Sequence, residues 1–225
     1  MRLYFLDPTS RAAVNITSLR NSGYETRKII AWEAKGLDSL IVIGNGTPDD
    51  KVIGVLSHYL DGNTVTGVVK PKEKMGLSAI DRLKTYLDSK INKIMVLIDQ
   101  ENRLLREFFD EALERLTQIG IDLTVEEEEM NRLRVCRCSL AGKRFEVIIV
   151  VNGLDDISTE KHTIEDHLIK SAGIEAKGSS KNSWNSLSKN EREEVFRKLK
   201  GKRGIIEDLF PQQVIGCKRL RNRNE

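Results

Sequence analysis

The chain has 225 residues, which is enough for one α/β domain with appended elements or for two small domains. Its 37 lysines and arginines nearly balance its 34 aspartates and glutamates, so the formal net charge of +3 does not by itself indicate a nucleic-acid partner. The three cysteines, two of them at 136 and 138, are not part of four zinc ligands at a recognisable spacing. No N-terminal segment has a signal-peptide pattern, and no apolar run is long enough to cross a bilayer. We therefore expect a cytoplasmic protein with reduced thiols, and its high charge content is also typical of proteins from hot environments.

The first half of the chain alternates strand patterns with helix patterns. In chain order, the sequence predicts a strand at 2–6, helices at 11–20 and 25–35, a strand at 39–44, a helix at 50–60, a strand at 64–70, a helix at 78–89, a strand at 93–99 and an amphipathic helix at 102–119. Strands that alternate with helices at this spacing form βαβ units. We therefore expect an α/β fold with a mostly parallel sheet flanked by helices.

The second half of the chain changes its pattern. Two β-rich runs, 133–140 and 144–152, are joined by a three-residue turn, which predicts an antiparallel hairpin at the edge of the sheet. A helix is expected around 164–169. His162 and His167 flank Glu165 and could support the site residues, with a position on the helix surface as the alternative. Further helical segments follow at 189–200 and 205–209.

Composition divides the chain into four parts. A stretch rich in Gly, Ser and Asn at 177–186 predicts a linker or mobile loop, although its Trp184 could fold back onto the core. We expect an N-terminal β-α unit at 1–38 packed on the core, an α/β core at 39–172, a linker or mobile loop at 173–188, and C-terminal helices with a basic tail at 189–225.

The strand at 93–99 ends on acidic residues. Its apolar run is typical of a strand buried on both faces, and Asp99 and Glu101 stand at its end, one position apart. Two carboxylates there are candidate ligands for a hard divalent cation, because Mg²⁺ favours one or two carboxylates together with water and substrate phosphate. An alternative is that Asp99 only caps the helix that follows.

Two further polar clusters also follow predicted strands. One is the turn at 45–50, and the other is the pair Glu165 and Asp166. In an open α/β sheet, ligands bind beyond the carboxyl ends of the strands, so we expect both clusters to meet Asp99 there. Carboxylates brought together in this way usually persist because a cation offsets their repulsion.

The turn after the second strand contains a glycine pair, Gly44 and Gly46, which could begin a dinucleotide-binding fingerprint. Asp49 stands where the third glycine would be, and no Walker lysine follows, so a tight strand-to-helix turn is the alternative. Lys70 and Lys72 follow the third strand on the same expected rim. They are candidate phosphate contacts, with a solvated loop as the alternative.

Segments 40–51, 96–101, 148–152 and 163–169 together resemble the Toprim domain of topoisomerases, primases and related nucleases. The likeness is strongest to the small stand-alone bacterial and archaeal Toprim-like proteins, and it covers residues 39–172. In that pattern one strand ends in Glu-Gly followed by an aspartate, a later strand ends in Asp-x-Asp, and the stand-alone forms add a downstream Glu-Asp on a helix. The matching residues here are Gly46, Asp49, Asp99, Glu165 and Asp166.

Two positions depart from the Toprim pattern. Glu101 replaces the second aspartate and keeps its charge on a longer arm, so it should still hold magnesium. Asn45 replaces the glutamate that serves as general acid or base in the family, and an amide cannot move a proton at neutral pH. General acid and base steps are typically worth about 10²- to 10⁴-fold in rate. Asp49 or Asp50 is the candidate to substitute for the missing glutamate.

The resemblance implies a Toprim-like protein with a divalent-metal site, namely a Mg²⁺- or Mn²⁺-dependent nuclease or other phosphodiester-processing enzyme acting on DNA or RNA. The implied roles are catalysis by Asp49 and Asp50, metal binding by Asp99, Glu101, Glu165 and Asp166, and turn or substrate contacts by Asn45, Gly46, Lys70 and Lys72. Two alternatives stay open. One is a Toprim-like binding or assembly module that has lost catalysis, and the other is a nucleotide-binding small-molecule enzyme.

Overall fold

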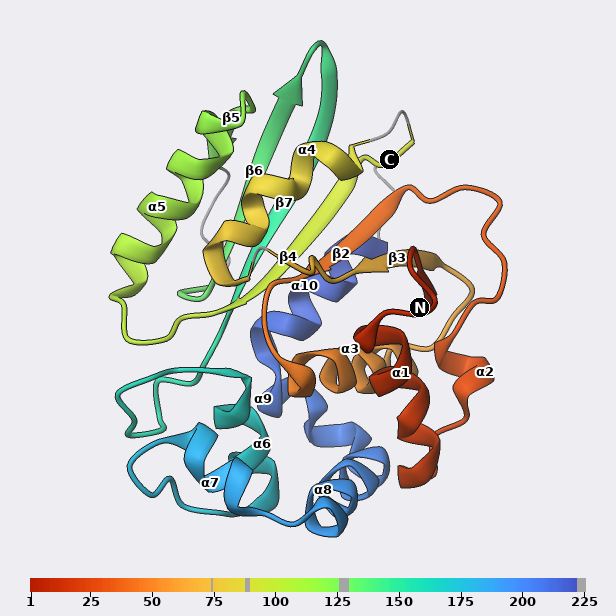
Figure 1. Ribbon diagram of the computed structural model, residues 1–225, viewed down its shortest axis with the longest axis vertical. Coiled ribbons are helices and arrows are strands. Elements are labelled where there is room, and N and C mark those ends of the chain that lie inside the picture. The colour runs from red at the N-terminus through yellow and green to blue at the C-terminus, as the bar shows by residue number, and fades with distance from the viewer. Residues whose placement is uncertain (74, 88–89, 126–129, 222–225) are drawn as a thin grey trace.

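The computed structural model describes residues 1–73, 75–87, 90–125 and 130–221, which form a seven-stranded sheet with helices on both faces (Figure 1). The strand order is β1-β3-β2-β4-β7-β6-β5. The strands are β1 (Arg2–Phe5), β2 (Ser39–Ile43), β3 (Val65–Val69), β4 (Lys93–Asp99), β5 (Asp122–Val125), β6 (Leu133–Leu140) and β7 (Lys143–Asn152).

The sheet has a parallel part and an antiparallel part. Strands β1, β3, β2, β4 and β7 run parallel, and β6 and β5 continue the sheet antiparallel. The predicted hairpin of β6 and β7 therefore joins the sheet through β7, while the short strand β5 was not predicted. The expected fold class, a mostly parallel α/β sheet with an antiparallel hairpin and a helical C-terminal segment, is confirmed.

Side chains of the central strands alternate between two hydrophobic cores. In β4, Met95 and Leu97 belong to one core, and Ile94, Val96 and Ile98 belong to the other. The first core is covered by α1 (Arg11–Thr17), α2 (Thr26–Ile29), α3 (Thr47–Tyr59), α6 (Ile164–Ala172), α7 (Ser180–Ser186), α8 (Lys189–Gly201), α9 (Ile206–Leu209) and α10 (Pro211–Arg221). The second core is covered by the 3-10 helix η2 (Gly76–Arg82), α4 (Leu83–Tyr86) and α5 (Leu105–Gln118).

Two predicted helices are much shorter than their patterns indicated. The helix expected at 25–35 ends after α2, because Ile30 turns extended and pairs with Leu3 of β1. The helix expected at 78–89 is mainly the 3-10 helix η2, with one α-helical turn in α4. Residues 88–89 of that prediction lie outside the described residues. In both places tertiary contacts outweigh local helix propensity.

The polar segment around 177–186 is not a loop, so that part of the linker prediction was wrong. It contains helix α7, which begins after Ser179, whose Oγ accepts a hydrogen bond from the Asn182 N–H at 3.1 Å. Trp184 is 3 % exposed and packs edge-on against Phe196 of α8, with ring centroids 5.9 Å apart. The expectation that Trp184 could fold back onto the core is confirmed.

The last helix, α10, packs very closely on the centre of the sheet. A Cβ atom at Gly216 would lie 2.8 Å from Met95 Sδ and 2.8 Å from Val150 Cγ2, so only glycine allows this approach. Basic residues predicted as a tail belong to this helix, where Lys218 pairs with Glu207 and Arg219 pairs with Glu146. Residues 222–225 of that prediction lie outside the described residues.

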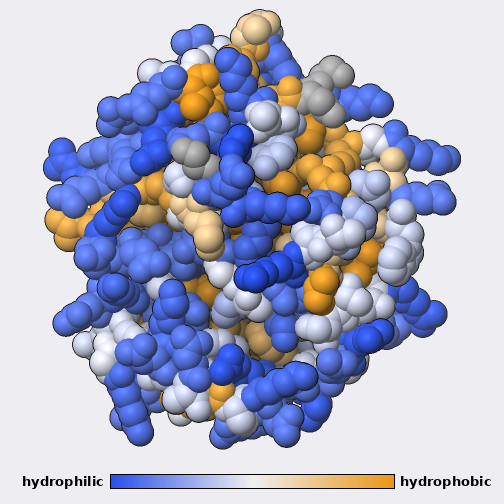
Figure 2. Space-filling model, viewed as in Figure 1, coloured by the Kyte–Doolittle hydropathy of each residue, from blue (hydrophilic) through white to orange (hydrophobic). Residues whose placement is uncertain are grey.

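Hydrophilic residues cover most of the face shown in Figure 2, and apolar residues appear there in scattered areas. No helix in the described part of the chain combines the length and the apolar composition that a membrane span requires.

Candidate functional site

Three polar side chains continue the inward-facing series of three neighbouring parallel strands. Asn45 continues the alternation of Ile41 and Ile43 just beyond β2. In the same way, Asp99 follows Met95 and Leu97 in β4, and Asn152 follows Ile148 and Val150 in β7. The six apolar residues of these series all belong to the first core. Asp99 and Asn152 are register partners across β4 and β7. Because successive side chains of a strand alternate between faces, all three polar groups emerge on the same face at the carboxyl edge.

Two amides hold two carboxylates at this edge. Asn152 Nδ2 donates hydrogen bonds to Asp99 Oδ1 at 2.9 Å and to Asp49 Oδ1 at 2.7 Å. Asn45 Nδ2 donates to the other carboxylate oxygen, Asp99 Oδ2, whereas Asn45 Oδ1 is buried with no hydrogen-bond partner among the described residues. Asp49 reaches the cluster from the first turn of α3.

Asp99 also contacts a helix, but not the one that follows it in sequence. Its Oδ1 accepts a 3.1 Å hydrogen bond from the N–H of Ile164, the first residue of α6. Helix α5 begins only at Leu105 and has no side-chain cap. The alternative prediction that Asp99 caps the following helix was therefore wrong. The contact with α6 instead brings Glu165, the next residue, beside the cluster.

The cluster carries more carboxylates than its surroundings neutralise. Burial raises the pKa of Asp99 to about 7, the hydrogen bond from Asn152 opposes this shift, and the charges of Glu165 and Glu101 add to it. Burial also raises the pKa of Asp49 well above its ordinary value, and repulsion from Asp99 and Glu165 contributes. At neutral pH the cluster therefore favours either a bound proton or a bound cation.

A pocket of about 680 Å³ opens in front of the cluster. Its lining includes the polar turn and the carboxylates, namely Asn45, Gly46, Asp49, Asp99, Glu101 and Glu165. The lining also includes basic, amide and aromatic residues, namely Lys51, Lys181, Trp184, Asn185, Arg192 and Phe196. Pockets of roughly 300–1,000 Å³ commonly hold small-molecule ligands or cofactors.

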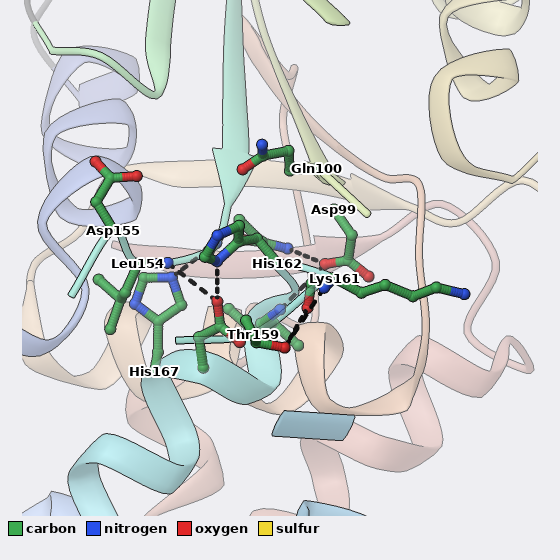
Figure 3. Close-up of polar contacts among 12 residues, drawn as sticks. Asp99, Gln100, Leu154, Asp155, Thr159, Lys161, His162 and His167 are labelled. Carbon is green, nitrogen blue, oxygen red and sulfur yellow. Dashed lines mark hydrogen bonds and ion pairs between the residues drawn. The ribbon is translucent and has the colours of Figure 1, made fainter. Parts of the chain in front are cut away.

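Glu101 lines the pocket in a constrained backbone conformation. Its φ is 59°, a left-handed value that is uncommon for a residue other than glycine. The backbone N–H and C=O of Glu101 both pair with His162 at 2.9 Å, which fixes the chain after β4 against the loop that leads into α6. In Figure 3, Asp99 lies on one side of His162 and His167 on the other.

Asp166 lies behind the pocket rather than in its lining. Its Oδ2 accepts a 3.1 Å hydrogen bond from the Leu154 N–H and lies 2.8 Å from His162 Nδ1. Asp166 therefore anchors the loop after β7, and its Oδ1 is buried with no hydrogen-bond partner among the described residues.

The buried Asp50 pairs with the partly buried Lys70 beside the turn, and neither residue lines the pocket. Lys70 Nζ lies 3.1 Å from both carboxylate oxygens of Asp50 and donates to the Gly46 carbonyl at 2.8 Å. Asn15 Nδ2 also donates to Asp50 at 2.8 Å. Lys72 lies farther out, where its exposed ammonium is 3.5 Å from Asp7. The Asp50–Lys70 pair thus holds the turn that positions Asn45 and Asp49.

Two buried residues outside the pocket lining, Gln213 and His167, support the cluster from behind. Gln213 of α10 donates a 2.9 Å hydrogen bond to Asn152 Oδ1. His167 is fully buried, so the alternative of a surface position was wrong; its Nδ1 lies 2.7 Å from the Leu209 carbonyl and its Nε2 accepts from the Gly153 N–H at 3.2 Å. Burial lowers the pKa of His167 to about 3, so the ring is neutral at pH 7. The sequence did point to Asn152, because it is the polar residue that ends the apolar run of β7.

The fold and this pocket define an α/β protein with a carboxylate-lined pocket at the carboxyl edge of its parallel strands. No protein-family model matches the chain, and comparison with curated proteins and with solved structures found no significant match. Across the described ranges, no three His, Cys, Asp or Glu side chains already converge as a metal-binding group. The oxygen donors of the cluster nevertheless suit a hard cation, and the unpartnered Asn45 Oδ1 offers a further oxygen.

Proposed function

We propose that the chain is a Toprim-like protein that binds Mg²⁺ or Mn²⁺ at Asp99 and Glu165, beside Asp49, and processes a phosphodiester of DNA or RNA. The observation that carries this proposal is the buried pair Asp49 and Asp99, which share the Asn152 amide and have raised pKa values. A divalent cation would replace the proton that this pair otherwise favours. Glu101 lines the same pocket and could add a further ligand.

The bound cation would supply electrostatic stabilisation to a phosphoryl oxygen. The protein's own contribution is to hold the carboxylates in place through Asn45, Asn152 and the N–H of Ile164. Asp49 is our candidate for proton transfer, because it lines the pocket and because burial and the charge of Asp99 raise its pKa well above the ordinary value. Asp50 is less suited to that role because Lys70 and Asn15 already occupy its carboxylate.

One observation favours a second candidate function, a binding module without catalysis. Asn45 stands where the Toprim pattern has its proton-transferring glutamate, and its amide is committed to Asp99. Such a protein would bind the cation and a phosphate ligand without cleaving it. Cation binding and cleavage therefore have to be measured separately.

Thermal unfolding in the presence of increasing Mg²⁺ or Mn²⁺ tests the cation site. A ligand that binds only the native state stabilises it by about 2.7 kcal/mol at a concentration of 100 Kd. We expect the melting temperature to rise for wild type and to stay constant for Asp99→Asn. Asp156→Asn is the control, because its exposed carboxylate pairs with Lys170 outside the pocket. An equal rise in wild type and Asp99→Asn would exclude the proposed site.

Cleavage is tested with single-stranded, duplex and supercoiled DNA and with RNA. Metal-dependent cleavage by wild type that is lost in Asp99→Asn would support the enzyme. Cation binding by wild type without cleavage of any of these substrates would instead support the binding module. Cleavage that persists in Asp99→Asn would come from a contaminant or from another site.

A further inference from the structure

The pocket has a basic side that the proposed cation site does not use. It consists of Lys51 from α3, Lys181 from α7 and Arg192 from α8. Helices α7 and α8 lie outside the segment 39–172 that resembles a Toprim domain, whereas Lys51 lies inside it. The three cations line the same cavity of about 680 Å³ as the carboxylates of Asp49 and Asp99.

Lys51 is the most informative of the three cations. Its side chain is half-buried, and its Nζ lies 5.2 Å from the centre of the Phe196 ring, within cation–π range. Among the residues that the structure describes, no carboxylate forms an ion pair with Lys51; the nearby Glu193 pairs with Lys189 at 3.9 Å. Because partial burial of an ammonium without a counter-ion is unfavourable, a ligand anion is the natural partner.

Arg192 is held in place without being neutralised. Its Nε donates to the Leu187 carbonyl at 2.9 Å and its Nη2 to the Asn185 carbonyl at 3.1 Å, which anchors the guanidinium to the turn between α7 and α8. These acceptors carry no formal charge, so the positive charge of Arg192 remains available to the pocket. Lys181 extends from the first turn of α7 beside it, where its side chain is exposed.

We propose that Lys51, Lys181 and Arg192 form a phosphate subsite that takes the phosphate of a free nucleotide or of a single-strand end. This inference deepens the proposed function and rests on it, since the phosphate would bridge the basic side and the cation at Asp99. Magnesium is commonly bound through one or two carboxylates together with substrate phosphates, which is the arrangement that the two sides of this pocket provide. A cavity of this volume accommodates a small-molecule-sized group rather than the interior of a duplex.

The test measures binding of thymidine 5′-monophosphate, inorganic phosphate and a single-stranded oligonucleotide, with and without its 5′-phosphate, by calorimetry at fixed salt. Lys51→Met removes the charge and keeps most of the side-chain length, whereas Lys51→Arg keeps the charge. Lys189→Met is the matched control, because Lys189 is an exposed lysine that pairs with Glu193 and does not line the pocket. Each variant is also titrated with Mg²⁺ while its thermal unfolding is followed.

We expect Lys51→Met to weaken binding of the phosphate ligands about tenfold or more, which corresponds to about 1.4 kcal/mol. Lys51→Arg and Lys189→Met should bind them nearly as wild type, and the Mg²⁺-induced stabilisation should be the same in all of them. Preference for the phosphorylated oligonucleotide over its unphosphorylated form assigns a strand end. Tight binding of the mononucleotide without that preference assigns a free nucleotide.

Unchanged phosphate affinity in Lys51→Met, or an equal loss in Lys189→Met, would overturn the subsite. Those results would not contradict the cation site, because stabilisation by Mg²⁺ is measured separately. Conversely, an absence of Mg²⁺ stabilisation in wild type would contradict the proposed function. The phosphate measurements, repeated in a chelator, would then still decide whether the three cations bind phosphate.

Discussion

Gln213 Nε2 donates a 2.9 Å hydrogen bond to Asn152 Oδ1, and this contact fixes which end of the Asn152 amide faces the pocket. With its oxygen committed to Gln213, the amide presents its nitrogen to Asp49 and Asp99. Helix α10 thereby orients Asn152, which lies 61 residues before Gln213 in the chain, at the end of β7. Gln213 is fully buried and does not line the pocket itself, so we regard it as a positioning residue.

We predict that Gln213→Leu weakens Mg²⁺ binding, because the freed Asn152 amide no longer holds the two carboxylates in one geometry. The neighbouring Gln212 provides a matched control. It is also buried and bonds to the carbonyls of Val151 and Gly153, but it does not contact Asn152. Both substitutions should lower the free energy of unfolding by about 1–3 kcal/mol, since each leaves buried polar groups unpaired. Only Gln213→Leu should lower the Mg²⁺ affinity; equal affinities in the two variants would show that Gln213 has no positioning role.

Asn152→Asp should make the native chain dependent on a divalent cation. The substitution places a third carboxylate between Asp49 and Asp99 and removes the donor that binds both. In a chelator at neutral pH, we expect the free energy of unfolding to fall by about 3–5 kcal/mol, the range seen when one partner of a buried charged pair is removed. Mg²⁺ should restore much of this loss, which urea unfolding with and without the cation would measure. A variant that is as stable as wild type in chelator would contradict the tight coupling of the three side chains.

The raised pKa of Asp99 gives the metal-free protein a characteristic pH dependence. The pKa is about 7 in the folded chain and about 3.9 in an unfolded one. Between these values the folded state binds more protons, so the free energy of unfolding decreases as the pH rises, by at most about 1.4 kcal/mol per pH unit for one group. Urea unfolding in chelator should therefore show Asp99→Asn gaining stability relative to wild type from pH 4 to about 7. If the free energy of unfolding changed with pH in the same way in both proteins, Asp99 would have an ordinary pKa.

Much of the fold could be predicted from local patterns, because the central strands are continuous apolar runs. The runs that became β4 and β7 are buried along nearly their whole length, and their alternation with helices indicated the parallel sheet. The strand order could not be predicted, since it depends on contacts between distant segments. Helix α7 was hidden by its polar composition, because its place is fixed by Trp184 packing on Phe196.

The site was predictable where a residue type and a strand end coincided. Asp49, Asp99 and Glu165 line one pocket, as their positions after strands and at helix starts had indicated. Sequence reasoning could not tell that Asp50, the neighbour of Asp49, turns away to Lys70, because one step along a helix rotates the side chain by about 100°. It also overlooked Asn152, since an uncharged amide gives a weaker chemical signal than a carboxylate.

His167 should give a pH dependence of the opposite sign. Burial lowers its pKa to about 3, against about 6.5 in an unfolded chain. Between these values the unfolded state binds the additional proton, so the stability that the neutral ring contributes is lost as the pH falls below about 6.5. We expect His167→Gln to reduce this acid sensitivity in urea unfolding. His58→Gln is the control, because the His58 ring is only partly buried and should affect the slope less. If the free energy of unfolding fell equally steeply with decreasing pH in wild type and His167→Gln, the buried His167 ring would not be neutral.

Gly216→Ala tests the close packing of α10 on the sheet. This packing places Gln213 of α10 against Asn152. The added Cβ would lie 2.8 Å from both Met95 Sδ and Val150 Cγ2, so the helix would have to move outward. We expect a loss of about 1–3 kcal/mol in the free energy of unfolding, as for other overpacked cores, and weaker Mg²⁺ binding because Gln213 moves with the helix. Gly201→Ala is the control, since no neighbouring atom lies within 4 Å of a Cβ at that position. It should be neutral or slightly stabilising by helix propensity. If Gly216→Ala unfolds at the same urea concentration as Gly201→Ala, α10 does not lie this close to β4 and β7.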